Sequence, residues 1–189
     1  GKTESGTIWL SPKFTSPYAF YQFWLNAADA DVYKYLKYFS FIDVAEIADI
    51  QRSDQDSGRK PEAQGILAAA VTELVHGAEG LQAARRISEA LFSGDITTLT
   101  ADDLKQLELD GLPCIELPGP AQPIVDTLVV TELAKSNKMA REFIGNNAVS
   151  VNGQAVTSVD FQLNGDIALN GRYFVLRRGK KLFHLVKFA

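Results

Sequence analysis

Four cations gather close to the C-terminal end of this chain, in the run Arg177-Arg178-Gly179-Lys180-Lys181. Guanidinium groups pair with phosphate oxygens through two parallel hydrogen bonds, whereas lysine ammonium groups bind them as point charges. On a turn, such side chains can reach successive phosphates of a nucleic-acid backbone. The run therefore predicts phosphate binding, with a merely solvated hairpin tip as the plain alternative.

A second basic segment, upstream of the first, supports phosphate binding. It contains Lys135, Ser136, Lys138 and Arg141, and the last two lie three residues apart, on one face of a helix. Residues 167–189 carry +6; because the whole chain carries −4, residues 1–166 carry −10. The chain thus has a local positive end on an acidic body, and a polyanion responds to that local field.

The other reactive side chains do not form a set. His76, His184 and Cys114 are far apart in the sequence and lack the spacing of metal ligands. We therefore expect no complete catalytic site and no metal site. A single cysteine, no apolar run of membrane-spanning length and no signal-peptide pattern indicate a soluble cytoplasmic protein without a membrane partner.

The basic segments are predicted to lie in a small α+β domain over residues 123–189. Helical segments are expected over 124–133 and 137–144. The pattern then alternates at 149–151 and runs into Asn152-Gly153, a strong hairpin signal because both central residues of that turn need positive φ. Strands at 173–176 and 182–186 flank the basic run, which is thus the loop of a second hairpin.

An α-helical bundle is predicted over residues 13–110, which makes the chain a multi-domain α and α+β protein. Ser16 and Pro17 mark the first helix start. Further helices are expected over 29–39, from Asp43, over 61–76 and 80–92, and from Thr100, with aromatic residues mostly in the core. Residues 1–12 are predicted to be a connector, and the Pro- and Gly-rich residues 111–122 a linker.

The second basic segment carries a family resemblance. Ser136-Asn137-Lys138-Met139-Ala140-Arg141-Glu142-Phe143-Ile144, followed by Ala148-Val149-Ser150-Val151-Asn152-Gly153, resembles the S4 RNA-binding domain. In that family a helix pair followed by a small sheet presents basic side chains to structured RNA. The resemblance implies that the basic residues named above, together with Ser136, contact RNA.

The chain as a whole resembles bacterial tyrosyl-tRNA synthetases. The matching stretches are Trp9 to Asn26, Asp29 to Val32, Leu74 to Gly77, Gly80 to Ala84, Leu91 to Gly94 and the basic loop. In that family a catalytic domain is followed by an anticodon-binding helical domain and an S4-like domain, and only the latter two are present. The resemblance implies that this part binds the anticodon stem and variable arm of tyrosine tRNA. Asp29 and Asp31 become candidate anticodon contacts, although an Asp before a helix is first a cap.

The first residues, Gly1-Lys2-Thr3, resemble the end of the mobile loop that steadies ATP phosphates in class I synthetases. Lys2 would be its last lysine; the tail of a phosphate-binding P-loop is the rival interpretation. Because no methionine begins the chain, we expect it to be a piece of a longer protein. The longer protein would be a dimer that uses ATP to attach tyrosine to its tRNA. This piece is expected to be monomeric, without a cofactor and inactive alone.

Three alternatives remain open from the sequence. A stand-alone S4-type protein would bind ribosomal RNA through the same domain. A helical protein-interaction scaffold would leave the basic hairpin as plain surface. A chain with residual catalytic activity would show tyrosine-dependent exchange between ATP and pyrophosphate.

Overall fold

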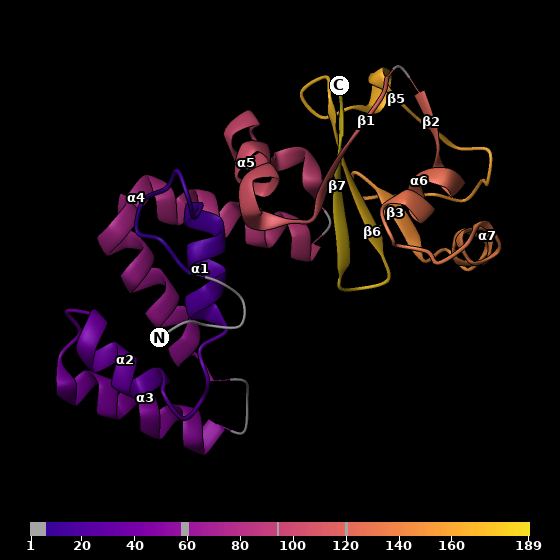
Figure 1. Ribbon diagram of the computed structural model, residues 1–189. Helices are drawn as coiled ribbons and strands as arrows, with labels where there is room; N and C mark the ends of the chain where they lie inside the picture. Colours follow the sequence, from indigo (N-terminus) through magenta and orange to yellow (C-terminus); the bar gives the residue numbers. More distant parts are fainter. Residues whose placement is uncertain (1–6, 58–60, 94, 120) are drawn as a thin grey trace. The chain divides into compact units, whose positions relative to one another are not determined.

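The structure is a computed structural model that describes residues 7–57, 61–93, 95–119 and 121–189 (Figure 1). These residues belong to two compact units, Gly1–Arg85 and Arg86–Ala189, each of which is described by itself.

Helices make up the described part of the first unit. They are α1 (Pro17–Leu25), α2 (Val32–Phe39), α3 (Val44–Ser57) and the beginning of α4 (Ala63–Ser93). The Ser16 hydroxyl accepts a hydrogen bond from the Ala19 amide, which confirms the predicted start of α1. A small core holds the helices together through the buried residues Phe20, Val32, Leu36, Ile47, Ala63, Leu67 and Val71.

Helix α4 consists of two helical stretches that meet at Gly77. This residue has φ 71° and ψ 177°, a conformation that is essentially restricted to glycine. At Gly80 an added Cβ would lie 2.6 Å from the Cβ of His76. Two glycines thus permit the bend, in agreement with the two separate helical patterns in the sequence.

Only some of the aromatic residues of α1 and α2 are core residues. Phe20 is 1% exposed, but Phe39 is 43% and Tyr38 is 67% exposed. The outer rings, with Leu74 of α4, line an apolar pocket of about 600 Å³. The prediction that this aromatic stripe is mostly core therefore holds for its inner face alone.

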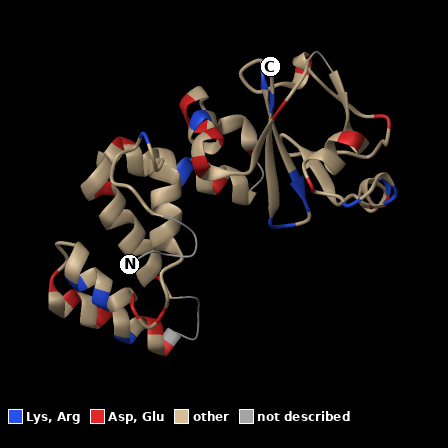
Figure 2. Cartoon of the chain, in the orientation of Figure 1, with Lys and Arg blue, Asp and Glu red and all other residues tan. Residues whose placement is uncertain are grey.

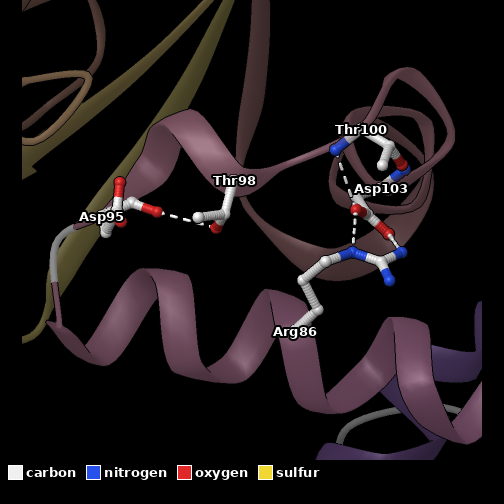
Figure 3. A network of polar contacts seen from close by, with 5 residues as sticks. All are labelled: Arg86, Asp95, Thr98, Thr100 and Asp103. Carbon is white, nitrogen blue, oxygen red and sulfur yellow. Dashed lines mark hydrogen bonds and ion pairs between the residues drawn. The ribbon is translucent and has the colours of Figure 1, made fainter.

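The second unit begins with the end of α4 and a short helical segment. That segment comprises η1 (Ile96–Thr98), α5 (Ala101–Gln106) and η2 (Leu107–Gly111). Thr100 begins α5 in a capping box with Asp103, as its position before a helical pattern predicts. Figure 3 shows Arg86 of α4 reaching the same Asp103 carboxylate, so that one buried acid joins both helices.

A five-stranded sheet forms the centre of the second unit. Its order is β1 (Cys114–Leu117), β7 (Leu182–Phe188), β6 (Tyr173–Arg178), β3 (Val149–Val151) and β4 (Gln154–Ala155). Only the β1–β7 pair is parallel. Asn152 and Gly153, between β3 and β4, both have positive φ, 50° and 82°, which confirms the predicted hairpin turn.

Helices cover one face of this sheet and a carboxylate anchors the other. On the first face, α6 (Ile124–Val130) and α7 (Asn137–Gly145) pack against Phe174, Leu176 and Val186. On the opposite face, Glu108 of η2 accepts hydrogen bonds from the Tyr173 hydroxyl and from Lys187. Figure 1 shows α5 on one side of the β6–β7 hairpin and α6 and α7 on the other.

The segment predicted as a linker, residues 111–122, contains strands instead. It includes β1, which pairs with β7 with Cys114 opposite Leu185, and most of β2 (Ala121–Pro123), which pairs with β5 (Gln162–Asn164). Proline and glycine do end the helical pattern. An edge strand nevertheless tolerates nearby prolines, because the backbone N–H groups on its outer side have no strand partner. The Pro- and Gly-rich composition of residues 111–122 therefore indicates where the helices end, but these residues are not an unstructured linker.

Candidate nucleic-acid interface

The basic loop lies at one end of the β6–β7 hairpin, where Figure 2 shows blue segments on both strands of the turn. Lys180 and Lys181 are exposed, and Gly179 adopts a φ of 61° that allows the tight turn. Arg177 is held more firmly: its Nε donates a hydrogen bond to the Gly179 carbonyl, 2.8 Å away, and its guanidinium lies over the Phe183 ring. The loop therefore presents two exposed ammonium groups beside an ordered guanidinium.

Arg178 connects this loop to the second basic segment. Along β6 the side chains alternate between the two faces of the sheet, so Arg178 shares the face of Phe174 and Leu176, which α6 and α7 cover. Its guanidinium lies 4.8 Å from the centre of the Phe143 ring on α7, a cation–π contact. The structure thus brings together the two basic segments that the sequence singled out.

The second basic segment surrounds the N-terminus of α7. Ser136 is the N-cap, and its hydroxyl accepts a hydrogen bond from the Met139 amide at 3.3 Å. Lys135, Lys138 and Arg141 are exposed around it. The partial positive charge of a helix N-terminus adds to these cations, so the segment favours an anion. Ser136 has a structural role in the cap besides its predicted contact with RNA.

Lys187 does not belong to this basic surface. Its Nζ lies 2.8 Å from Glu108 Oε1 and 2.6 Å from Glu116 Oε2, and the side chain is 17% exposed. The hydrogen bond to Glu108, followed by that to Glu116, raises the pKa of Lys187 above its ordinary value. The +6 counted along residues 167–189 therefore overstates the charge available to a ligand, because one of the six cations stabilises the sheet.

The remaining predicted contacts belong to the first unit or lie outside the described residues. Asp29 Oδ1 accepts a hydrogen bond from Gln64 Nε2 at 2.6 Å, whereas Asp31 is the N-cap residue of α2 and makes no side-chain capping bond. Both belong to the first unit. Lys2 lies outside the described residues.

Two aromatic residues complete the basic surface, and no pattern in the sequence singled them out. Phe143 and Phe183 each lie against an arginine of the loop. Phe183 could have been found, because it stands opposite Arg177 when the two strands pair. Phe143 could not, because its contact with Arg178 depends on how α7 packs on the sheet.

The described residues contain no candidate metal site and no candidate membrane-spanning helix. Among them, no group of three or more His, Cys, Asp or Glu side chains is placed to hold a metal ion. Within the same residues, no helix has both the length and the apolar character needed to cross a membrane.

Family models account for nearly all of the chain. Residues 1–93 match the model for class I tRNA synthetases of the tryptophan and tyrosine type. Residues 103–186 match the model described as the C-terminal domain of SYY-like tyrosine–tRNA ligases. Both matched models describe parts of aminoacyl-tRNA synthetases.

Individual relatives identify the branch. The tyrosine–tRNA ligase of Aliivibrio fischeri strain MJ11 is 61% identical over 98% of this chain and 43% of its own length. That of Dechloromonas aromatica is 53% identical over the whole chain and 44% of its own length. The chain is also similar to a solution structure of a tyrosyl-tRNA synthetase C-terminal domain, with 40% sequence identity. The match covers 53% of this chain and all of that domain, with a TM-score of 0.42. The chain belongs to the tyrosine–tRNA ligase family and corresponds to the C-terminal part of its members.

Proposed function

We propose that this chain binds tyrosine tRNA through the surface formed by the β6–β7 loop and the N-terminus of α7. The observation that carries the proposal is the contact between Arg178 and Phe143, which sets the two basic segments side by side. Exposed or half-exposed cations from two elements, including Lys138 and Lys180, are then available to one ligand. Such a surface suits the phosphates of a folded RNA, which are closely spaced and fixed in position.

The family of the chain supports tyrosine tRNA as the particular RNA. Members of this family are named tyrosine–tRNA ligases, and the chain spans less than half of their length. The longer protein would attach tyrosine to this tRNA with ATP, as a cytoplasmic dimer. This chain would hold the variable arm with its basic surface and the anticodon stem with the first unit, where Asp29 and Asp31 are the candidate base contacts. We expect the chain by itself to be monomeric and to show no tyrosine-dependent exchange between ATP and pyrophosphate.

Replacement of Lys180 and Lys181 by Ala tests the basic surface. Each lysine that neutralises a phosphate releases counterions, so its loss should reduce the slope of log Kd against log salt by about 1. We expect the double variant to bind a tyrosine tRNA transcript about 10-fold to 100-fold more weakly at 0.15 M salt and with a slope lower by about 2. Fluorescence anisotropy with labelled tRNA, titrated between 0.05 and 0.3 M salt, measures both quantities.

A matched control removes the same charge elsewhere. Arg52 and Lys105 are exposed and paired with Asp49 and Asp102, so the double replacement Arg52→Ala and Lys105→Ala lowers the net charge equally. This control should retain most of the affinity and slope of the unchanged chain. Equal affinity and slope in the two double variants would remove the loop from the interface.

Competition tests the identity of the RNA. Unlabelled tyrosine tRNA should displace the labelled transcript at lower concentration than an equal length of ribosomal RNA helix. Equal displacement by both would favour a general structured-RNA binder, and no RNA binding at moderate salt would favour a protein-interaction role for the helical unit.

A further inference from the structure

A pocket of about 410 Å³ opens beside the basic loop, on the second unit. The turn after α6 forms one wall, the beginning of β1 a second, and the first residues of β7 a third. Its volume lies in the range of small-molecule pockets and exceeds what one aromatic ring requires. His184 is three residues beyond Lys181, which is about 10 Å along a strand. A nucleotide whose phosphate is held by the loop can therefore reach the pocket with its base.

The pocket combines apolar walls with a few polar groups. Ile115, Leu133 and Leu182 offer apolar contact, and Glu132 and His184 supply the polar edge. The Nε2 of His184 is buried without a hydrogen-bond partner in the described part of the chain. Burial lowers the pKa of His184, and the opposing influences of Glu132 and the Thr131 backbone do not reverse that shift. The imidazole is therefore largely neutral near pH 7, and it adds no positive charge to the pocket wall.

Glu132 has a backbone conformation that is unusual for a residue other than glycine. It follows Thr131, the C-cap residue of α6, and has φ 58°, in the left-handed region where helices commonly end with glycine. A glutamate there strains the backbone, and strain of this kind gathers at functional sites. Glu132 is also an exposed carboxylate on a pocket wall adjoining a surface that attracts polyanions. Beside a bound polyanion the charge of Glu132 is unfavourable unless the carboxylate itself contacts the ligand.

We propose that this pocket receives one unstacked base of the bound RNA, and that Glu132 accepts hydrogen bonds from the exocyclic amino group of that base. Carboxylates accept from the amino group of cytosine and, by the same chemistry, from those of guanine and adenine, whereas uracil has no such group. Proteins that read RNA sequence take unpaired bases and bind their edges in this way. This inference rests on the proposed tRNA binding and adds a base-specific contact to it.

The test compares Glu132→Gln with Glu142→Gln in tRNA binding. Glu142 is an exposed acid on α7, so its replacement removes an equal charge near the same surface. If Glu132 were a plain surface charge, its loss would tighten binding, as the loss of any acid beside a polyanion does. If it accepts hydrogen bonds from a base, Glu132→Gln should weaken binding of a tyrosine tRNA transcript at least about fivefold. Glu142→Gln should leave binding unchanged or slightly tighter.

The three outcomes separate this inference from the proposed function. Weaker binding by Glu132→Gln alone supports the pocket. Salt-dependent tRNA binding that is equal or tighter in both variants overturns the pocket and leaves the proposed function intact. No tRNA binding by the unchanged chain overturns both.

Chemical probing identifies the base. Kethoxal and dimethyl sulfate modify the Watson–Crick edges of unpaired guanine, adenine and cytosine, and a carbodiimide modifies uracil. We expect the unchanged chain to protect one amino-bearing base and Glu132→Gln to lose that protection while hydroxyl-radical protection of the backbone persists. Protection of a uracil, or protection that survives the substitution, would contradict the proposed contact.

Glu132→Gly separates function from folding. Glycine adopts the left-handed conformation without strain, so this variant should unfold at a higher temperature than the unchanged chain. It should nonetheless bind tRNA as weakly as Glu132→Gln. A stabilised variant with full affinity would show that Glu132 has no part in binding.

Discussion

Asp103 is a single buried carboxylate that holds two helices together. Its oxygens accept hydrogen bonds from Arg86 Nε and Nη2, both at 2.7 Å, and from the Thr100 amide at 2.9 Å (Figure 3). Burial raises the pKa of Asp103, but the hydrogen bonds from Arg86 and Thr100 outweigh it and the net pKa is lowered. The side chain is 1% exposed, so an amide in its place would confront these donors with its own NH₂ group.

We therefore predict that Asp103→Asn destabilises the protein by about 2 to 3 kcal/mol at pH 7. Because the folded pKa is lowered, the carboxylate stabilises the fold above its unfolded pKa, near 4, and this contribution is lost as pH falls through the folded pKa. The stability curves of the two proteins should converge below about pH 4. Urea unfolding between pH 3 and 7 measures the difference.

Asp102→Asn is the control for this prediction. Asp102 lies on the same helix, its side chain is 85% exposed, and its partner Lys105 is also exposed. Its replacement should change the stability by no more than about 0.5 kcal/mol. A pH-independent difference between Asp103→Asn and the unchanged chain would show that the charge of Asp103 is not what stabilises this contact.

Among the elements, α4 depends on a single residue conformation. Gly77→Ala would place a Cβ at φ 71° and ψ 177°, which costs about 1 to 3 kcal/mol. Gly65→Ala is the matched control, because Gly65 lies within a helical stretch of α4 and an added Cβ there has nothing within 4 Å. This control should gain up to about 1 kcal/mol from helix propensity. Thermal unfolding by circular dichroism should move the two midpoints in opposite directions; a shift in the same direction would contradict the assigned bend.

The elements also show what the sequence can predict and what it cannot. The Asn152-Gly153 turn was predictable because its conformation is set by the two residues themselves. Strand β1 was not, because its four residues become a strand only by pairing with β7, about seventy residues later. In the candidate site, the cations were visible as a run, but the Phe143 ring against Arg178 and the partners of Lys187 come from distant segments. Glu132 gave no signal, because the sequence predicted a helix over 124–133, whereas α6 ends at Val130 and Glu132 has a positive φ.

For the whole molecule, the second unit should fold independently and should need its first residues to do so. Residues 86–189 include β1 and Glu108, whereas a fragment that begins at Pro123 lacks both. In the shorter fragment the edge of β7 is unpaired and Lys187 loses two carboxylates while half-buried. We predict cooperative unfolding for residues 86–189 and a midpoint lower by at least about 10 °C, or no cooperative transition, for residues 123–189.

Lys187→Met in the shorter fragment separates the effect of the unpaired Lys187 charge from the effect of the unpaired β7 edge. It removes the unpaired charge and keeps the apolar stem, so it should recover part of the lost midpoint. Equal midpoints for the two parent fragments would show that residues 86–122 are dispensable and that the domain begins at Pro123.

The contact between Arg178 and Phe143 also affects the thermodynamics of binding. An arginine that moves freely in the unbound protein loses about 2 kcal/mol of side-chain entropy when it is fixed on a ligand. Arg178 and Arg177 already lie against aromatic rings, so much of that loss has occurred during folding. Lys180 and Lys181 are exposed at the turn, so a bound RNA would have to order them. In the proposed complex the arginines would therefore set the orientation of the RNA, whereas the lysines would add attraction that depends little on its exact shape.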